Sequence, residues 1–223
     1  MTAVATMFDP AIARRQMVDS QLRPNRVLDS RIIAAMGEVP RELFVPERLA
    51  DVAYVDEDIE IAHGRYLMEP MVLGRLLQSL DLQASQRVLE IGSGCGYATA
   101  VLARIVSQVV ALEVDADLAT RTSRLLARLE VNNAQVTVGS LAAGEPTRAP
   151  YDRILFSGAA EEVPDAVKRQ LAEGGRLAAV VRTNGVGKAV VVERHGEAFG
   201  VREVFDAAIP ILPGLTRPKG FVF

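Results

Sequence analysis

The segment 87–97, RVLEIGSGCGY, constrains the fold of this chain more than any other stretch. Residues 87–91 form a short apolar run with β-branched side chains, which is typical of a buried parallel strand. Three glycines follow at alternate positions, and residues 97–106 are compatible with a helix. Glycines let the backbone approach a ligand closely, and a helix N-terminus offers free N–H groups. The segment therefore predicts the opening unit of a nucleotide-binding α/β domain, the alternative being a glycine turn in an unrelated α/β protein.

The order of the expected strands and helices after residue 85 supports this prediction. Apolar strands alternate with helices, a pattern typical of a parallel sheet with helices on both faces. Residues 195–198 read as a turn between two further strands, which predicts a terminal antiparallel hairpin. The expected strands are 87–91, 109–114, 135–138, 151–157, 176–182, 188–194 and 199–206, and the expected helices are 97–106, 116–130 and 164–171, the last stopped by Gly174 and Gly175.

The N-terminal residues read as helical and irregular instead. Asp9 is placed to cap a first helix, and Asp29 or Ser30 to cap a second. An edge strand or extended loop at 56–66 and a helix at 70–80 are expected to follow. We therefore divide the chain into an N-terminal helical and substrate-loop region, 1–80, packed on a core domain, 81–223.

Composition limits the partners and the location that can be expected. The 25 Lys and Arg residues against 28 Asp and Glu residues give a net charge of −3, so there is no global electrostatic reason to bind nucleic acid. The single cysteine, Cys95, excludes an intrachain disulfide and a cysteine-based zinc site, and we expect no metal. No apolar run reaches roughly 18 residues, and residues 1–15 lack a signal-peptide pattern. We expect a cytoplasmic protein that binds no membrane, with its oligomeric state open.

Glu113 lies at the end of the second expected strand, where such a sheet binds its ligands. An acidic side chain there can accept two ribose hydroxyls, from NAD or from S-adenosylmethionine. Dinucleotide sites favour G-x-G-x-x-G, whereas this chain has E-x-G-x-G-x-G from Glu90 onward, which resembles the motif of class I S-adenosylmethionine-dependent methyltransferases. S-adenosylmethionine is thus the expected cofactor. The candidate cofactor-binding residues are Glu90, Gly92, Ser93, Gly94, Gly96, Tyr97 and Glu113.

Several segments outside this motif resemble the protein-L-isoaspartate O-methyltransferase family. Residues 41–46, RELFVP, look like the family's PR-x-x-FVP segment, and residues 88–97 closely resemble its glycine motif, including the tyrosine. Residues 149–154 and 174–177 continue a likeness that covers about residues 10–212. The resemblance implies a Rossmann-like methyltransferase sheet and methyl transfer from S-adenosylmethionine to the free carboxylate of L-isoaspartyl residues in damaged proteins, which are then the substrate partners.

One departure from the family pattern lies in the expected substrate loop. The family's G-x-T-I-S-x-P, with its serine near the substrate and the methyl group, corresponds to residues 64–70. Met68 stands at the serine position and has no hydroxyl to offer. Arg65 and Tyr66 are candidates for holding a carboxylate and for supplying the missing donor. The alternative is a solvated Arg65 and a Tyr66 packed in the core.

A second departure lies in the expected adenine site. The family's G-D-G after the third strand has an aspartate that contacts the adenine amino group, and this chain has Gly139-Ser140-Leu141 there. Ser140 can accept one hydrogen bond but carries no charge. Ser140 and Leu141 therefore join the candidate cofactor-binding residues.

The reaction that the resemblance implies needs no general base. A carboxylate with a pKa of about 4 is ionised at neutral pH, so catalysis can rest on alignment with the methyl group and on exclusion of water. Three hypotheses are compatible with the sequence. They are a repair methyltransferase for isoaspartyl proteins, a methyltransferase of the same fold acting on another carboxylate or small molecule, and a non-catalytic cofactor-binding protein that acts through a partner.

Overall fold

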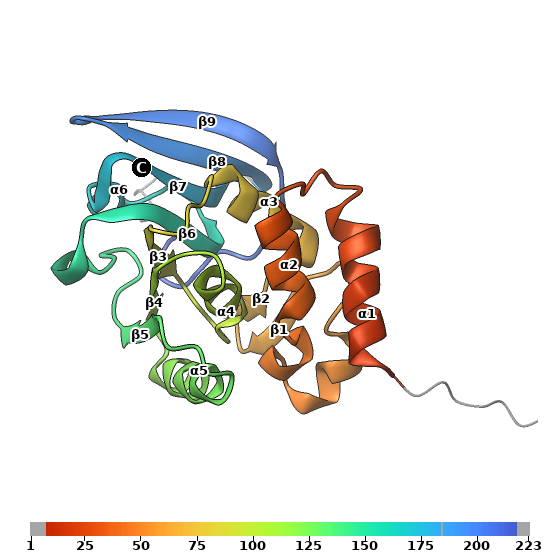
Figure 1. Ribbon diagram of the computed structural model, residues 1–223. Helices are drawn as coiled ribbons and strands as arrows, with labels where there is room; N and C mark the ends of the chain where they lie inside the picture. The colour runs from red at the N-terminus through yellow and green to blue at the C-terminus, as the bar shows by residue number, and fades with distance from the viewer. Residues whose placement is uncertain (1–7, 184, 218–223) are drawn as a thin grey trace, which may run out of the picture.

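A seven-stranded sheet organises the computed structural model, which describes residues 8–183 and 185–217 (Figure 1). The strand order is β5-β4-β3-β6-β7-β8-β9; neighbours from β5 to β7 pair in parallel, and β8 and β9 add antiparallel pairs. The predicted sheet and its terminal hairpin are thereby confirmed. The strands are β3 (Arg87–Ile91), β4 (Gln108–Glu113), β5 (Ala134–Val138), β6 (Tyr151–Ala160), β7 (Leu171–Thr183), β8 (Val186–His195) and β9 (Ala198–Asp206).

Alternation along β3 separates the two faces of the sheet. Val88 packs in the apolar cluster that contains residues of α2, α3, α4 and α5, whereas Leu89 and Ile91 pack in a second cluster with residues of α6 and the C-terminal loop. Glu90 has the same parity as Val88 and therefore faces the helical side. The helices are α2 (Ser30–Glu38), α3 (Pro70–Ser79), α4 (Tyr97–Ala103), α5 (Ala116–Arg128) and α6 (Asp165–Lys168).

The N-terminal region is a helical layer beside the sheet (Figure 1). Both predicted helix starts are capped: Asp9 accepts the N–H of Ala11 at 2.8 Å, and Asp29, rather than Ser30, accepts the N–H of Arg31 at 2.9 Å. The segment predicted as an edge strand or extended loop is a separate two-stranded antiparallel hairpin, β1–β2. One apolar cluster runs across residue 80, and the domain boundary there stays a prediction. The remaining elements are the α-helix α1 (Pro10–Met17), the π-helix η1 (Val18–Leu22), the 3₁₀ helices η2 (Arg41–Phe44), η3 (Glu47–Val52) and η4 (Pro146–Arg148), and the strands β1 (Ile59–Ala62) and β2 (Arg65–Leu67).

The predicted helix 164–171 is wrong in its length and in its end. α6 has four residues, and β7 already begins at Leu171, which pairs with Tyr151. The next pair joins Arg153 and Arg176, so four residues of β7 lie opposite one residue of β6. Gly174, with φ +66°, serves this bulge rather than a helix terminus.

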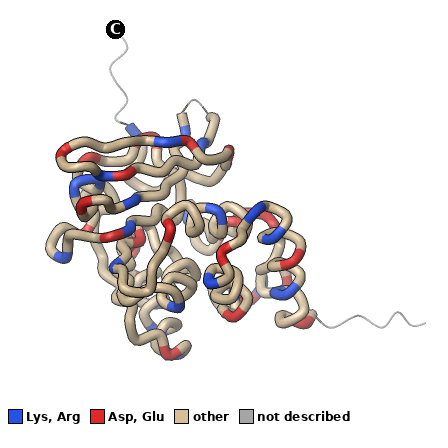
Figure 2. The backbone as a smooth tube through the Cα atoms, turned by 45° about the horizontal axis from the view of Figure 1, so that its top comes forward, with Lys and Arg blue, Asp and Glu red and all other residues tan. Residues whose placement is uncertain are grey.

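Charged residues of both signs are interspersed over the helical layer and the sheet, as Figure 2 shows. Among the described residues, no helix combines the length and the apolar character needed to cross a membrane. Of residues 1–15, for which no signal peptide is expected, residues 1–7 lie outside the described part of the chain.

Two glycines with positive φ allow the constraint on the glycine loop to be measured. A Cβ on Gly96 (φ +86°) would lie 2.4 Å from Cγ2 of Thr122, which is fixed by its hydrogen bond to the carbonyl of Gly94. A Cβ on Gly174 (φ +66°) would meet nothing within 4 Å. We expect Gly174→Ala to lower the free energy of unfolding by about 1 kcal/mol and Gly96→Ala by about 3 kcal/mol, because overpacking adds to backbone strain. Urea denaturation measures both, and equal losses would contradict the steric argument.

Candidate active site

The glycine loop between β3 and α4 is tied to the end of β4. The N–H groups of Gly92 and Ser93 donate to the carbonyl of Leu112 at 2.8 and 3.1 Å. The N–H of Gly94 donates to Oε2 of Glu113 at 2.7 Å. All three glycines have positive φ, at +77°, +56° and +86° along the loop. The loop thus has the backbone conformation that only glycines adopt readily, and it lies against the carboxylate singled out from the sequence.

Glu113 is completely buried at the carboxyl end of β4. Its Oε1 accepts the N–H groups of Val114 and Asp115 at 2.9 and 3.1 Å. Its Oε2 accepts, besides Gly94, the guanidinium Nη2 of Arg65 at 2.5 Å. These four hydrogen bonds use both oxygens of the buried carboxylate.

Arg65 is therefore not the solvated surface residue of the alternative interpretation, which is wrong. It starts β2, is 5% exposed, and points inward from the β1–β2 hairpin to Glu113. Its Nε is buried without a hydrogen-bond partner. Tyr66, the next residue, is half-buried and lines two small cavities rather than packing in the apolar core.

The three candidate catalytic residues meet around one small cavity of about 10 Å³. Arg65, Tyr66 and Met68 line it together with Ser157 and Leu212. A second cavity of about 20 Å³ lies deeper, and Tyr66, Met68 and Ser157 line it too. Each cavity has room for about one water molecule. The predicted cofactor-binding residues that line the deeper cavity are Glu90, Gly92, Ser93 and Tyr97.

Besides Nε of Arg65 and Nη1 of Arg41, two polar groups that line the deeper cavity have no partner. Oγ of Ser93 and the phenol of Tyr97 are both buried and without hydrogen bonds. Buried polar groups are normally satisfied, so unpaired ones beside a cavity point to a ligand that supplies the missing bonds.

Ser157 and Leu212 line the candidate site, and the sequence reasoning missed both. Ser157 follows the β6 residues that pair with β3, and its Oγ donates to Glu90 at 2.6 Å. The sheet-edge rule that selected Glu113 could have found it. Leu212 lies far along the chain and covers the glycines: a Cβ on Gly92 or Gly158 would lie 2.7 or 2.6 Å from Cδ2 of Leu212. No sequence pattern marks that contact.

Arg41 is a third missed residue, and it anchors the substrate loop. Its side chain is fully buried; Nε donates to the carbonyl of Ala53 at 2.5 Å, and Nη2 donates to the carbonyl of Met68 at 2.8 Å. The guanidinium lies 4.8 Å from the centre of the Tyr97 ring. Its place in the segment 41–46, which carried the family resemblance, was the available signal.

Ser140 and Leu141 lie at the same edge of the sheet but outside these cavities. The N–H of Gly139 donates to the carbonyl of Glu113 at 2.9 Å, which brings the end of β5 beside β4. Leu141 is buried in the second apolar cluster, and Ser140 is exposed. Their contact with adenine stays a prediction.

Comparison with known proteins identifies the family. The model of the family described as protein-L-isoaspartate(D-aspartate) O-methyltransferase (PCMT) matches residues 13–209. The chain belongs to this family. It is 42% identical over 173 residues to protein-L-isoaspartate O-methyltransferase 1 of Rhodopseudomonas palustris (strain HaA2). The matched residues cover 78% of this chain and 70% of the relative. It is 39% identical over 204 residues to protein-L-isoaspartate O-methyltransferase 2 of Anaeromyxobacter sp. (strain Fw109-5). This match covers 92% of this chain and 84% of the relative.

Solved structures of protein-L-isoaspartate O-methyltransferases have the same fold. One superposes with a TM-score of 0.79 at 25% identity and covers 91% of this chain and 67% of that chain. Another, from Plasmodium falciparum in complex with S-adenosyl-L-homocysteine, has a TM-score of 0.76 at 20% identity. The superposition covers 89% of this chain and 97% of that chain. At that identity the second likeness shows the fold alone.

Glu90 gives this family member a carboxyl group that titrates near neutral pH. It is fully buried; Oγ1 of Thr99 donates to it at 2.5 Å, and Ser157 donates to its other oxygen. Burial raises the pKa of Glu90 to about 7, and these hydrogen bonds oppose the rise only in part.

This pKa predicts a pH-dependent stability that one variant removes. An unfolded glutamate loses its proton near pH 4.5, whereas folded Glu90 keeps it up to about pH 7. The free energy of unfolding therefore falls by about 3 kcal/mol from this group as the pH rises through that window. Glu90→Gln is neutral throughout, so we expect it to gain about 3 kcal/mol relative to wild type between pH 4.5 and pH 8. Urea denaturation at several pH values tests this; parallel curves for the two proteins would contradict it.

Proposed function

We propose that this chain transfers the methyl group of S-adenosylmethionine to the free carboxylate of L-isoaspartyl residues in damaged proteins. The observation that carries the proposal is the buried carboxylate of Glu113, held against the glycine loop in a chain that belongs to the protein-L-isoaspartate O-methyltransferase family. The names of its relatives support the same substrate class.

The residues around the loop fit the proposed cofactor. Glu113 is placed to accept ribose hydroxyls, and the unpaired groups of Ser93 and Tyr97 supply further hydrogen bonds beside the loop. When bound, S-adenosylmethionine supplies an electrophilic methyl group on its sulfonium. We assign Ser140 and Leu141 to the adenine end of the cofactor because they follow β5 at the edge where Glu113 ends β4.

The chain's own contribution to the reaction is alignment and exclusion of water. The acceptor carboxylate is already ionised at neutral pH, so no side chain has to remove a proton from it. Arg65 is placed to hold that carboxylate and the phenol of Tyr66 to donate a hydrogen bond to it, because both line the cavity that Met68 lines. Met68 is 5% exposed and contributes an apolar wall in place of the family's serine.

Two other functions are tested by the same experiments. Because Met68 has no hydroxyl, a different carboxylate or small molecule is the alternative acceptor. A non-catalytic role, with the cofactor bound and a partner protein contacted, is the second alternative. Location in the cytoplasm is part of the proposal and rests on the sequence.

A pair of peptides tests the proposed function. We expect methyl transfer to a peptide that contains one L-isoaspartyl residue and none to the matching aspartyl peptide, because the two differ in where the free carboxylate lies. We also expect Met68→Ser to raise kcat/KM for the isoaspartyl peptide by about tenfold, since one oriented donor is worth roughly 3 kcal/mol when no other group replaces it and Tyr66 replaces part of it here. Transfer of radiolabelled methyl measures both.

S-adenosyl-L-homocysteine binding, measured by calorimetry, is the control. Binding without transfer to either peptide would reject the proposal, and activity on a panel of carboxylate metabolites would then select the alternative acceptor. Binding without activity on any acceptor would leave the non-catalytic role.

A further inference from the structure

The carboxylate of Glu113 is fully occupied by the protein itself. Three of its four hydrogen-bond donors are backbone N–H groups, from Gly94, Val114 and Asp115, and the fourth is Arg65. A carboxylate offers about four acceptor positions, so a ribose hydroxyl can bind Glu113 only in place of one of these donors. The backbone donors belong to the glycine loop and the strand end, whereas Arg65 is a side chain that can rotate away.

The cavities beside Arg65 and beside the glycine loop are small. Cavities of about 10 and 20 Å³ cannot hold a nucleoside, and Arg65 and Leu212 line the smaller one. A Cβ on Gly94 would lie 3.8 Å from the guanidinium of Arg65, so this side chain also covers the glycine loop. Arg65 therefore occupies one acceptor position of Glu113 and covers part of the glycine loop.

We propose that Arg65 is a gate that becomes a positioning residue. It occupies Glu113 until a cofactor ribose displaces it, and the released guanidinium then binds the carboxylate of the methyl acceptor. Arg65 shares a cavity with Tyr66 and Met68, so it stays beside the reacting position after release. Its Nε, unpaired in the closed state, becomes available for a bidentate contact. The cofactor consequently binds before the methyl acceptor. This order of binding rests on the proposed function, which identifies both ligands.

Removal of the gate is expected to have opposite effects on the two ligands. In Arg65→Ala, Glu113 keeps its three backbone donors and is free for the ribose. We expect the dissociation constant of S-adenosyl-L-homocysteine to fall by about tenfold, the effect of one competing charged hydrogen bond, and KM for the isoaspartyl peptide to rise by about tenfold. Calorimetry and initial rates at saturating cofactor measure the two, and Arg65→Lys is expected to lie between wild type and Arg65→Ala in both.

Glu60→Ala is the matched control within the hairpin. The Glu60 carboxylate accepts the N–H of Gly64 at 3.2 Å, so its removal loosens the β1–β2 turn without changing Glu113. An equal gain in cofactor affinity for Glu60→Ala, or unchanged or weaker affinity for folded Arg65→Ala, would overturn the proposal. The calorimetric result needs no methyl acceptor. A protein that binds S-adenosyl-L-homocysteine but methylates no isoaspartyl peptide would therefore reject the proposed function and leave this test standing.

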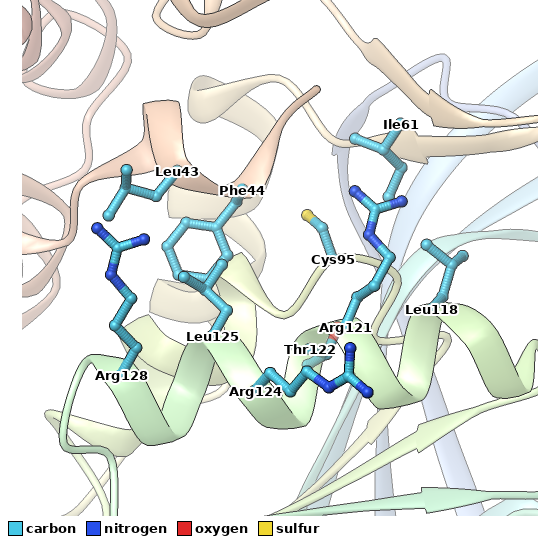
Figure 3. Close-up of a pocket in the computed structure, with 10 residues that line it drawn as sticks. All are labelled: Leu43, Phe44, Ile61, Cys95, Leu118, Arg121, Thr122, Arg124, Leu125 and Arg128. Carbon is cyan, nitrogen blue, oxygen red and sulfur yellow. The ribbon is translucent and has the colours of Figure 1, made fainter. Parts of the chain in front are cut away.

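A separate groove of about 290 Å³ lies beside α5 (Figure 3). Figure 3 shows the guanidinium of Arg128 near Leu43 at one end and that of Arg121 near Ile61 at the other, with apolar side chains between them. Arg124 runs along the outer side of the helix, away from Leu43. The lining residues are Leu43, Phe44, Ile61, Cys95, Leu118, Arg121, Thr122, Arg124, Leu125 and Arg128.

The charge of this groove is not compensated. Within residues 8–183 and 185–217, the ion pairs include none of Arg121, Arg124 and Arg128. Arg121 and Arg128 are two helical turns apart, a separation of about 10 Å. An extended polypeptide rises about 3.3 Å per residue and points alternate side chains to opposite faces. Carboxylates four residues apart, about 13 Å, therefore lie on one face and can reach both guanidiniums, while the residue midway between them on that face contacts the apolar floor.

We infer that this groove binds an extended acidic segment of the protein substrate, next to the residue that is methylated. Cys95 lines both the groove and the deeper cavity, and Ile61 belongs to the hairpin that carries Arg65, so the groove adjoins the closed site. The inference rests on the proposed function for the polypeptide nature of the substrate and adds a charge preference to it.

Peptides that differ only in flanking charge test the groove. We expect an isoaspartyl peptide flanked by glutamates four residues apart to have a KM about tenfold below that of its glutamine counterpart, with the same kcat. The double variant Arg121→Gln, Arg128→Gln should abolish this difference, and Arg124→Gln should leave most of it. The preference should also weaken at high salt.

Direct binding separates this inference from the proposed function. A fluorescent glutamate-containing peptide without isoaspartate should bind wild type more tightly than the double variant, by fluorescence anisotropy. An unchanged charge preference in the double variant, or an equal loss in Arg124→Gln, would overturn the inference.

Discussion

The ion pair between Arg65 and Glu113 is the interaction on which the site depends. It joins a hairpin of the N-terminal region to the end of a core strand, across 48 positions of the chain, and both side chains are almost fully buried. A buried pair of this kind contributes little net stability compared with apolar packing, because desolvation opposes the attraction. Its importance lies in specificity: it fixes which side chain faces the glycine loop and which acceptor atoms remain for a ligand.

The sequence predicted the parts of the fold that short-range patterns control. Strand β3 begins and ends at the predicted residues, and the glycines after it have the positive φ values that their spacing indicated. The helix predicted at 164–171 was wrong because the glycine pair that reads as a helix stop forms a bulge between β6 and β7 instead. Local signals for a helix end and for a bulge use the same residue type, and only strand pairing distinguishes them.

A site residue could be predicted from the sequence where a single strand both places the side chain at the ligand-binding edge of the sheet and supplies its functional group. Glu113 followed from its place at a strand end, and the same rule would have found Ser157. The burial of Arg65 did not follow, because an arginine in a charged, alternating segment is usually solvated. Leu212 and the carbonyl contacts of Arg41 depend on segments that meet only after folding, and no periodicity in the sequence encodes them.

Arg41 determines which part of the closed site can move. Its guanidinium holds the carbonyl of Met68 on one side and the carbonyl of Ala53 on the other, so the backbone three residues after Arg65 is anchored to the N-terminal layer. A large displacement of that backbone would break buried hydrogen bonds to a charged group, whereas rotation of the Arg65 side chain breaks only its own. Opening of the site is therefore a change of side-chain rotamer that leaves the anchored backbone in place, rather than a hinged motion of a domain.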